Sequence, residues 1–469
     1  TEVRPLTACL GSLPALEPKI KLVNFFLRRP ELAASIDIID EIKPFLPHID
    51  YFLGVDKPVT YLVLLQNNHE LRANGGFFGS YAVITLKRSD LLREVGPLDI
   101  RFQDIYVPDG ALVGHVDPPA PIQTAFKQGW FRLRDSDWEP DFPEAAKTVR
   151  WFLTKGSEIN PDILVTLNLA TIEKVAAVVG EIDIPEYGLK LTADNLYSLL
   201  QNEAEIDFFP GSTQKRDVLT AVGTALTKKL VVLSPNQYLQ IAKILVETAN
   251  RQNLLLNSTN PALQTTLETK NWAGKLTIPS CQKENCANDT VLLVETNLGA
   301  NKANCCVERK SAHTITKTDT DISHLIYLTF INSSPLENPL PPRFFGGNYI
   351  SYLRYYLPEN AKNIRLTAQP TLPRTLTQYP IPFDGINQKS FDLKFNYGLR
   401  EVGFFHLTAA GTTSAVQLSY DLPLDGNPVN YQLNLLKQNG LSFSPQEINL
   451  FGKSHSTNLE TGFSIVTPL

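Results

Sequence analysis

Arginine and aspartate side chains gather in three short stretches in the first third of the chain. They are Arg72 beside the turn Asn74-Gly75-Gly76, then Arg101 with Asp104, and then Arg134 with Asp135 and Asp141. Guanidinium groups bind phosphate oxygens through paired hydrogen bonds, and nearby carboxylates can hold Mg²⁺ against the same phosphates. These residue types therefore predict phosphoryl or pyrophosphoryl chemistry.

Each of these stretches also has a structural interpretation. Arg72 could form an ion pair at a tight turn between two strands, instead of presenting its guanidinium to an anion beside the glycine turn. Arg134 and Asp135 could form a local ion pair, and Asp141 could cap the helix that follows it. The sequence leaves both interpretations open.

A fourth candidate lies near residue 215, where Lys215 and Arg216 open a predicted helix. Cations at the start of a helix oppose its macrodipole, so their presence needs a reason. An anionic ligand would supply that reason, and simple solvent exposure is the alternative.

Other chemistries are excluded or lack support. The histidines show no metal-like spacing, and neither a Gly-x-Ser-x-Gly motif nor a phosphate-binding glycine loop occurs in the chain. The formal net charge of −5 over 469 residues, with no long basic tract, gives no support to nucleic-acid binding. No run of 18 uncharged apolar residues is present to suggest a membrane span.

The cysteines predict an exported protein. Cys281, Cys286, Cys305 and Cys306 lie close together in the sequence and are candidates for two disulfides, with a zinc site as the alternative. The adjacent Cys305-Cys306 pair fits the usual ligand spacing of zinc sites poorly, which favours disulfides. The remaining cysteine, Cys9, follows Leu6-Thr7-Ala8, which is similar to a bacterial lipoprotein box.

The first polar stretch follows a buried strand. The apolar run Tyr61–Leu65 stops abruptly at this stretch and predicts a strand covered on both faces. Its carboxyl end is where open α/β sheets usually build their ligand sites. Strands and helices alternate up to about residue 250, which favours an α/β sandwich.

After about residue 288 the pattern changes to short alternating runs separated by Pro and Gly. This pattern is typical of antiparallel β-sandwiches. We therefore expect a helical N-terminal segment (1–57), an α/β domain (58–287) and an immunoglobulin-like β-sandwich region (288–469).

Several segments strongly resemble the bacterial domain-of-unknown-function family 4012, whose members are envelope-associated. The segments are Tyr61–Tyr81, Asp104–Gly110, Arg134–Pro143, Gly180–Pro185, Asn271–Gly274, Thr296–Lys302 and Tyr431–Gly440. The order of features also resembles, more distantly, the LytR-CpsA-Psr family, which transfers glycopolymers from polyprenyl pyrophosphate carriers to peptidoglycan. In this comparison Gly180–Pro185 resembles a strand of that family, and Lys215-Arg216 resembles the arginine-rich start of a helix.

The second resemblance implies roles for the polar residues. Arg72, Arg101, Lys215 and Arg216 would bind pyrophosphate, Asp104, Asp135 and Asp141 would hold Mg²⁺, and Asp104, Asp135 and Arg134 would take part in catalysis. It also implies an α/β fold like that of the LytR-CpsA-Psr family.

The resemblances imply an extracytoplasmic protein of the cell envelope or surface. It would bind a polyprenyl-linked glycopolymer or peptidoglycan, and would be held near the membrane by a missing N-terminal anchor or by a lipid on Cys9. The departures from the LytR-CpsA-Psr pattern, such as the two residues between Arg101 and Asp104, keep a second hypothesis open. In that hypothesis the chain is a non-catalytic structural or adhesion protein of the cell surface.

Overall fold

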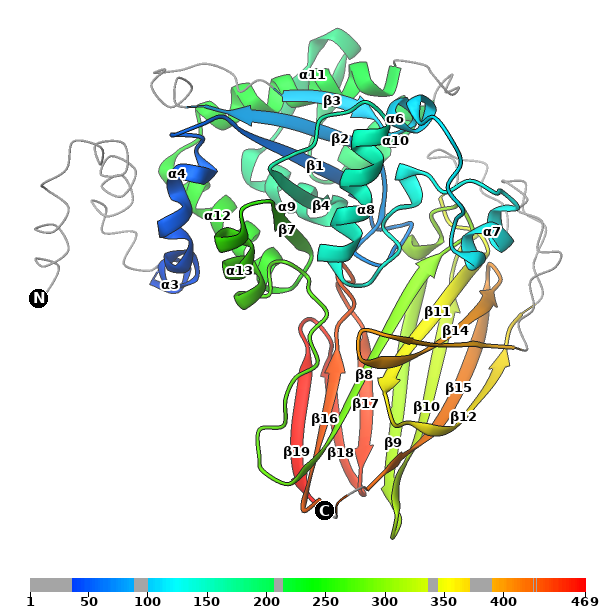
Figure 1. The fold of residues 1–469 in the computed structure, drawn as a ribbon. Coiled ribbons are helices and arrows are strands. Elements are labelled where there is room, and N and C mark those ends of the chain that lie inside the picture. Colours follow the sequence, from blue (N-terminus) through cyan, green and yellow to red (C-terminus); the bar gives the residue numbers. More distant parts are fainter. Residues whose placement is uncertain are drawn as a thin grey trace, which may run out of the picture.

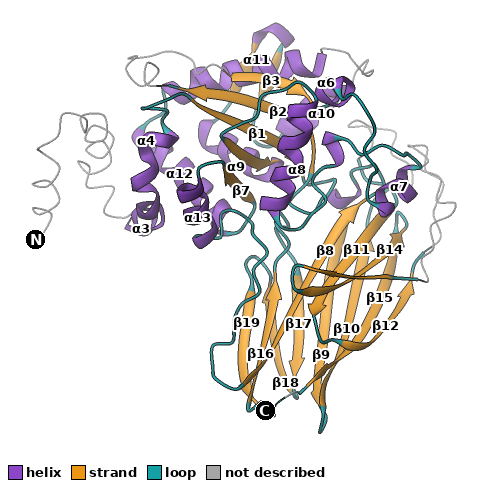
Figure 2. Ribbon diagram, in the orientation of Figure 1, coloured by secondary structure: helices purple, strands orange, loops and turns teal. Residues whose placement is uncertain are grey.

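A computed structural model describes residues 36–87, 100–205, 214–335, 345–371, 390–424, 426 and 428–469. The chain forms two stacked parts, an α/β part above a long two-sheet β part (Figure 1). α-Helices surround the smaller sheet, and strands dominate the rest (Figure 2). Cys9 and most of the predicted N-terminal segment lie outside the described residues.

The α/β part is built on a five-stranded sheet with the order β3-β2-β1-β4-β7. Its strands are β1 (Val59–Asn67), β2 (Phe77–Leu86), β3 (Ile100–Asp104), β4 (Ile163–Asn168) and β7 (Leu254–Ser258). β1 runs parallel to β4 but antiparallel to β2. The turn Asn74-Gly75-Gly76, called the glycine turn below, therefore joins two neighbouring strands. A separate two-stranded ribbon pairs β5 (Ile182–Ile184) with β6 (Leu189–Leu191).

Helices cover both faces of this sheet. Those with described bounds are α3 (Ile36–Ile42), α4 (Ile49–Phe52), α6 (Tyr106–Ala111), α7 (Ala120–Phe126), α8 (Phe142–Lys155), α9 (Leu169–Val179), α10 (Leu196–Glu205), α11 (Gln214–Val231), α12 (Pro235–Asn250) and α13 (Pro261–Thr269). Short 3-10 helices are η3 (Lys43–His48), η4 (Leu133–Asp135), η5 (Pro185–Tyr187) and η6 (Ala303–Cys305).

The two faces of the sheet have different cores. On one face, Leu62, Leu64 and Tyr81 pack with Val149 and Phe152 of α8. Alternate side chains of a strand point to opposite faces, so the remaining positions of β1 and β2 face the layer that contains α9, α10 and α11. A cavity lies between this second layer and the sheet.

The β part packs two six-stranded sheets face to face. The orders are β12-β15-β10-β9-β17-β18 and β13-β14-β11-β8-β16-β19. The strands are β8 (Cys286–Asn297), β9 (Val307–Lys317), β10 (Asp321–Asn332), β11 (Tyr349–Pro358), β12 (Lys362–Gln369), β13 (Asp392–Asn396), β14 (Leu399–Thr408), β15 (Thr412–Pro423), β16 (Asn430–Leu436), β17 (Pro445–Leu450), β18 (Lys453–Asn458) and β19 (Phe463–Pro468). Their inward residues form one core, which includes Ile326 and Leu418 from one sheet and Leu353 and Val402 from the other.

The predicted fold class is confirmed: an α/β arrangement precedes a strand-rich β-sandwich region. The sandwich has more strands than the seven to nine of immunoglobulin domains, and β8–β16 and β9–β17 pair in parallel. β3 was not expected as a strand, because its polar sequence Ile100–Asp104 lacks an apolar run. Its pairing with β2 at the sheet edge, rather than local propensity, makes it extended.

Candidate functional site

A cavity of about 320 Å³ lies between the sheet and the helix layer of α9, α10 and α11. We call it the sheet cavity. Its apolar wall includes Leu65, Phe77, Leu169, Ile172, Leu196, Leu200, Val218 and Leu219. The volume falls within the range of about 300–1,000 Å³ that is typical of small-molecule sites.

Local sequence explains why these elements meet here. β4 passes directly into α9, and the Asn168 side chain caps the new helix by accepting a hydrogen bond from the Thr171 backbone N–H at 2.9 Å. α9, α10 and α11 then present apolar side chains toward the sheet and toward one another. The cavity is the space that these side chains leave near the carboxyl ends of β1 and β4.

The rim of the sheet cavity is polar. Glu70, Tyr106 and Lys302 line it together with Gln66 and Asn67. Lys302 comes from the β part, from the loop that follows β8, and its backbone forms isolated bridges to residues 345 and 346. Both parts of the chain therefore contribute to this site.

Arg134, Asp135 and Asp109 lie behind the rim, around Tyr106. The Arg134 guanidinium donates to Asp109 Oδ2 at 2.8 Å and lies 5.4 Å from the centre of the Tyr106 ring. Burial raises the pKa of Asp135 to about 6, although the nearby positive charges of Arg134 and Arg72 oppose this shift. Burial also raises the pKa of Tyr106. These charges influence the rim, but Arg134 and Asp135 do not line the cavity itself.

Arg72 has a structural position. Its side chain is 5% exposed, donates to Glu70 Oε1 at 2.9 Å and to the Asn297 backbone oxygen at 2.6 Å, and lies over the ring of Phe77. These contacts join the glycine turn to the end of β8. The prediction that Arg72 binds pyrophosphate is not supported, because its hydrogen-bonding groups face protein partners.

The glycine turn is part of the junction between the two parts. Asn439 Nδ2 donates to Asn74 Oδ1 at 2.8 Å and to the Gly274 backbone oxygen at 2.9 Å. Gln438 Nε2 donates to the Arg72 backbone oxygen at 3.0 Å. The motif segments that begin at residues 61, 271 and 431 therefore converge at one interface.

Arg101 lies on the other side of the sheet from the cavity. It donates to Glu158 Oε1 at 2.7 Å, and Glu158 Oε2 also accepts from the Tyr81 hydroxyl, which belongs to the α8 face. Asp104 ends β3, and its Oδ1 accepts from the Tyr106 backbone N–H at 2.8 Å. Arg101 and Asp104 therefore do not form a joint site.

The remaining predicted ligands are also dispersed. Both carboxylate oxygens of Asp141 accept backbone N–H groups, from Glu144 at 3.1 Å and from Leu276 at 3.0 Å, so Asp141 caps α8 and fixes the chain after α13. The Arg216 guanidinium forms an ion pair with the carboxylate of its neighbour Asp217 at 3.3 Å. The Lys215 side chain lies outside the described residues.

The predicted magnesium ligands do not fit a common ion. The Asp141 oxygens are already occupied by backbone donors, and Asp135 Oδ2 faces Arg134 Nε at 3.7 Å. Within the described ranges, no three His, Cys, Asp or Glu side chains are placed to share a metal ion. A divalent cation held by Asp104, Asp135 and Asp141 is therefore not compatible with this geometry.

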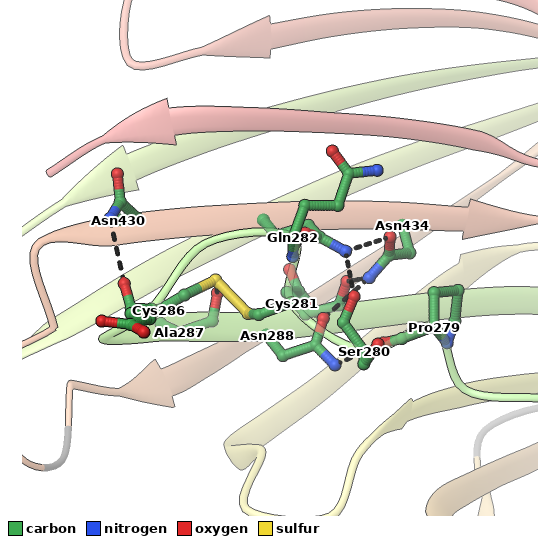
Figure 3. The surroundings of a disulfide bond; sticks show 12 residues. Pro279, Ser280, Cys281, Gln282, Cys286, Ala287, Asn288, Asn430 and Asn434 are labelled. Carbon is green, nitrogen blue, oxygen red and sulfur yellow. Dashed lines mark hydrogen bonds between the residues drawn. A yellow bond between two sulfur atoms is a disulfide. The ribbon is translucent and has the colours of Figure 1, made fainter.

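The clustered cysteines are paired in the structure, Cys281 with Cys286 and Cys305 with Cys306. Figure 3 shows the first bond beside β16, where Asn430 Nδ2 donates to the Glu284 backbone oxygen inside the closed loop. This arrangement corresponds to the favoured disulfide interpretation. The oxidised state in solution remains a prediction.

Sequence reasoning missed Glu70, Tyr106 and Lys302 as rim residues. Glu70 and Lys302 lie inside motif segments but carry no local signal of a shared site, because 232 positions separate them. Only the fold brings the loop after β8 onto the end of β1.

Known structures show limited similarity. TagV of B. subtilis is 13% identical, with 46% of this chain and 80% of that chain covered at a TM-score of 0.26. The Lin1025 protein from Listeria innocua is 12% identical, with 47% and 80% covered and the same TM-score of 0.26. At these TM-scores the similarity carries no conclusion about this chain.

No curated protein matches the sequence. None of the helices in the described part of the chain is long and apolar enough to cross a membrane. Residues 56–204 match the family described as "Protein of unknown function (DUF4012)". The resemblance to this family is thereby confirmed over residues 56–204.

Proposed function

We propose that the chain binds a polyprenyl-linked glycopolymer of the cell envelope, with part of the apolar chain in the sheet cavity and the phosphate-bearing head at its rim. The observation that carries the proposal is the combination of an apolar wall with a polar rim that includes Lys302. A lipid-linked sugar has the same division into an apolar chain and a polar, anionic head.

The apolar wall can account for affinity. Each methylene group removed from water contributes about 0.8 kcal/mol, so burial of even a few isoprene units would be substantial. The wall is formed by three helices and a sheet, whose side chains already face inward. A water-soluble ligand without an apolar chain would leave this surface unused.

The rim can account for recognition of the head. Lys302 is 9% exposed and supplies a cation, while Gln66, Asn67 and Tyr106 supply hydrogen-bonding groups. Glu70 is held by Arg72, which limits its repulsion of an anion. The head would therefore contact residues from both parts of the chain.

Binding without transfer is the function that the geometry supports best. The arginines expected to hold pyrophosphate do not line the sheet cavity: Arg72 is enclosed at the junction, and Arg101 pairs with Glu158 on the α8 face. Asp141 accepts two backbone N–H groups, and among the described residues no three His, Cys, Asp or Glu side chains are placed to share a metal ion. We therefore propose a carrier or presenting role at the cell envelope, with the extracytoplasmic location supported by the paired cysteines.

Calorimetric titration with geranylgeranyl pyrophosphate tests the proposal, with and without Mg²⁺. We expect binding that does not depend on Mg²⁺ and that weakens at least tenfold in Ile172→Trp, which fills the cavity from α9. Lys302→Met should weaken binding of the pyrophosphate but not of geranylgeraniol, which lacks the charge.

Lys394→Met is the matched control, because Lys394 is exposed on β13 and is not one of the lining residues. Its affinity should equal that of the unchanged protein. Absence of binding would contradict the proposal and leave the non-catalytic surface protein as the better hypothesis. Binding that requires Mg²⁺ would instead reinstate a metal site.

A further inference from the structure

A second, larger cavity lies where the α/β part meets the β part. Its volume is about 520 Å³, and we call it the junction cavity. Residues from both parts line it, among them Ala73, Asn271, Lys275, Lys437, Phe463 and Ser464. The junction cavity and the sheet cavity have no lining residue in common.

Lys437 is the unusual group of this cavity. It follows β16 directly and is only 6% exposed. Its ammonium group donates to Asn253 Oδ1 and to the Gln438 backbone oxygen, both at 3.1 Å. These acceptors are neutral amide oxygens, and among the described residues no carboxylate lies within ion-pair distance of Lys437.

The charged groups around the junction cavity are otherwise paired. Glu460 pairs with Arg251 at 3.0 Å, Glu268 pairs with Lys275 at 2.6 Å, and Asp141 accepts two backbone N–H groups. Burial, reinforced by the positive charge of Arg251, lowers the pKa of Lys437 to about 7. A buried ammonium without a counter-ion is costly, and an anion in the cavity would relieve this cost.

The other walls suit a sugar. Gln252 and Asn271 lie two positions beyond the last residues of α12 and α13. Both have the left-handed backbone conformation, with φ of 54° and 58°. Each offers a side-chain amide at the cavity, and the structure gives neither amide a hydrogen bond to another described side chain. An amide has both donors and acceptors, which matches the adjacent hydroxyl groups of a saccharide.

An aromatic ring and two hydroxyl residues complete this surface. Phe463 lies on the cavity wall beside Thr461, and Thr277 lines it as well. The volume lies within the range of about 300–1,000 Å³ of known ligand sites. The lining combines these polar groups with apolar side chains, among them Leu276, Leu292 and Leu436.

We propose that the junction cavity binds a short anionic saccharide, with Lys437 as the counter-ion of its carboxylate or phosphate group. The ligand would contact the chain after α13 in the α/β part and β16 and β19 in the β part. Its binding would therefore stabilise the junction between them. This proposal does not depend on lipid binding in the sheet cavity.

Calorimetric titration at pH 6 with digalacturonate, glucose 1-phosphate and maltose tests the proposal. The first two probes distinguish a carboxylate from a phosphate as the recognised group, and maltose is the neutral comparison. We expect one of the anionic probes to bind at least tenfold more tightly than maltose. Its affinity should fall at pH 9, where Lys437 has lost its proton.

Two variants and one control make the test specific to this cavity. Lys437→Met removes the charge, and Thr461→Trp places a large side chain in the cavity. Because Thr461 is exposed, the Thr461→Trp variant should fold even if the Lys437→Met variant does not. Both should weaken binding at least tenfold, whereas Lys453→Met, an exposed change on β18, should have no effect.

Equal affinity for maltose, unchanged affinity in Thr461→Trp, or no binding of either anionic probe would overturn the proposal. Titration of the same variants with geranylgeranyl pyrophosphate separates the two sites. Lys437→Met should leave lipid affinity unchanged, so a failure of one proposal can be recognised independently of the other.

Discussion

Gly75 and Gly440 touch backbone to backbone across the junction between the two parts of the chain. A Cβ atom added to Gly440 would overlap Gly75 Cα, and Gly440 also has a φ of +73°, which favours glycine. The glycine turn that looked like an anion-binding loop in the sequence is therefore a place where two distant segments approach closely. The hydrogen bonds from Gln438 and Asn439 to the same turn hold them together.

Gly440→Ala should destabilise the protein by about 2–4 kcal/mol, because a steric clash adds to the cost of positive φ. Urea unfolding measures this change. Gly452→Ala is the matched control: its φ is +83°, but a Cβ there meets no atom within 4 Å. It should cost only about 1 kcal/mol. Equal losses in the two variants would show that the close approach is not important.

Arg72→Met should lower the free energy of unfolding by about 3–5 kcal/mol, since it leaves the buried Glu70 carboxylate without its partner. The affinity of the folded variant for geranylgeranyl pyrophosphate should fall by no more than about tenfold, because the unpaired Glu70 carboxylate at the rim would repel the anionic head. Its affinity for uncharged geranylgeraniol should not change. Urea unfolding and calorimetry measure the two effects. A large loss of affinity with unchanged stability would restore Arg72 as an anion ligand.

Asp135 should make stability depend on pH between about 4 and 6. Its pKa is raised to about 6 in the folded chain, so the native state keeps a proton that the unfolded chain releases. The contribution of Asp135 to stability is therefore present at low pH and declines as pH rises through 6. Asp135→Asn should reduce this decline by about 1–3 kcal/mol. Unfolding curves at pH 4, 5, 6 and 7 test it, and an unchanged pH profile would contradict it.

The four clustered cysteines should be unreactive toward a thiol reagent in protein from an oxidising compartment. Alkylation followed by mass spectrometry should then label no cysteine other than Cys9. Because the Cys281–Cys286 bond closes a short loop, replacing both residues by serine should cost only about 2 kcal/mol. Full labelling of the four cysteines in native protein would contradict the disulfide assignment.

Much of the local structure could be predicted from the sequence. The apolar run Tyr61–Leu65 specified β1, and Asp141 before Pro143 marked the start of α8, where an acid can cap the free backbone N–H groups. Alternation of apolar and polar residues marked β10 and β15 of the sandwich. These features depend on neighbouring residues, so a sequence pattern can reveal them.

Only the tertiary structure decided which polar residues share a site. Arg72 is enclosed because Asn297, far along the chain, accepts its hydrogen bond, and Lys302 reaches the sheet cavity through the packing of the two parts. The face of the sheet that Arg101 occupies depends on the register of β3 against β2. The residue types in the sequence determined which chemistry was available. Burial and long-range pairing determined which of these groups could contact a ligand, and both depend on contacts that the local sequence does not encode.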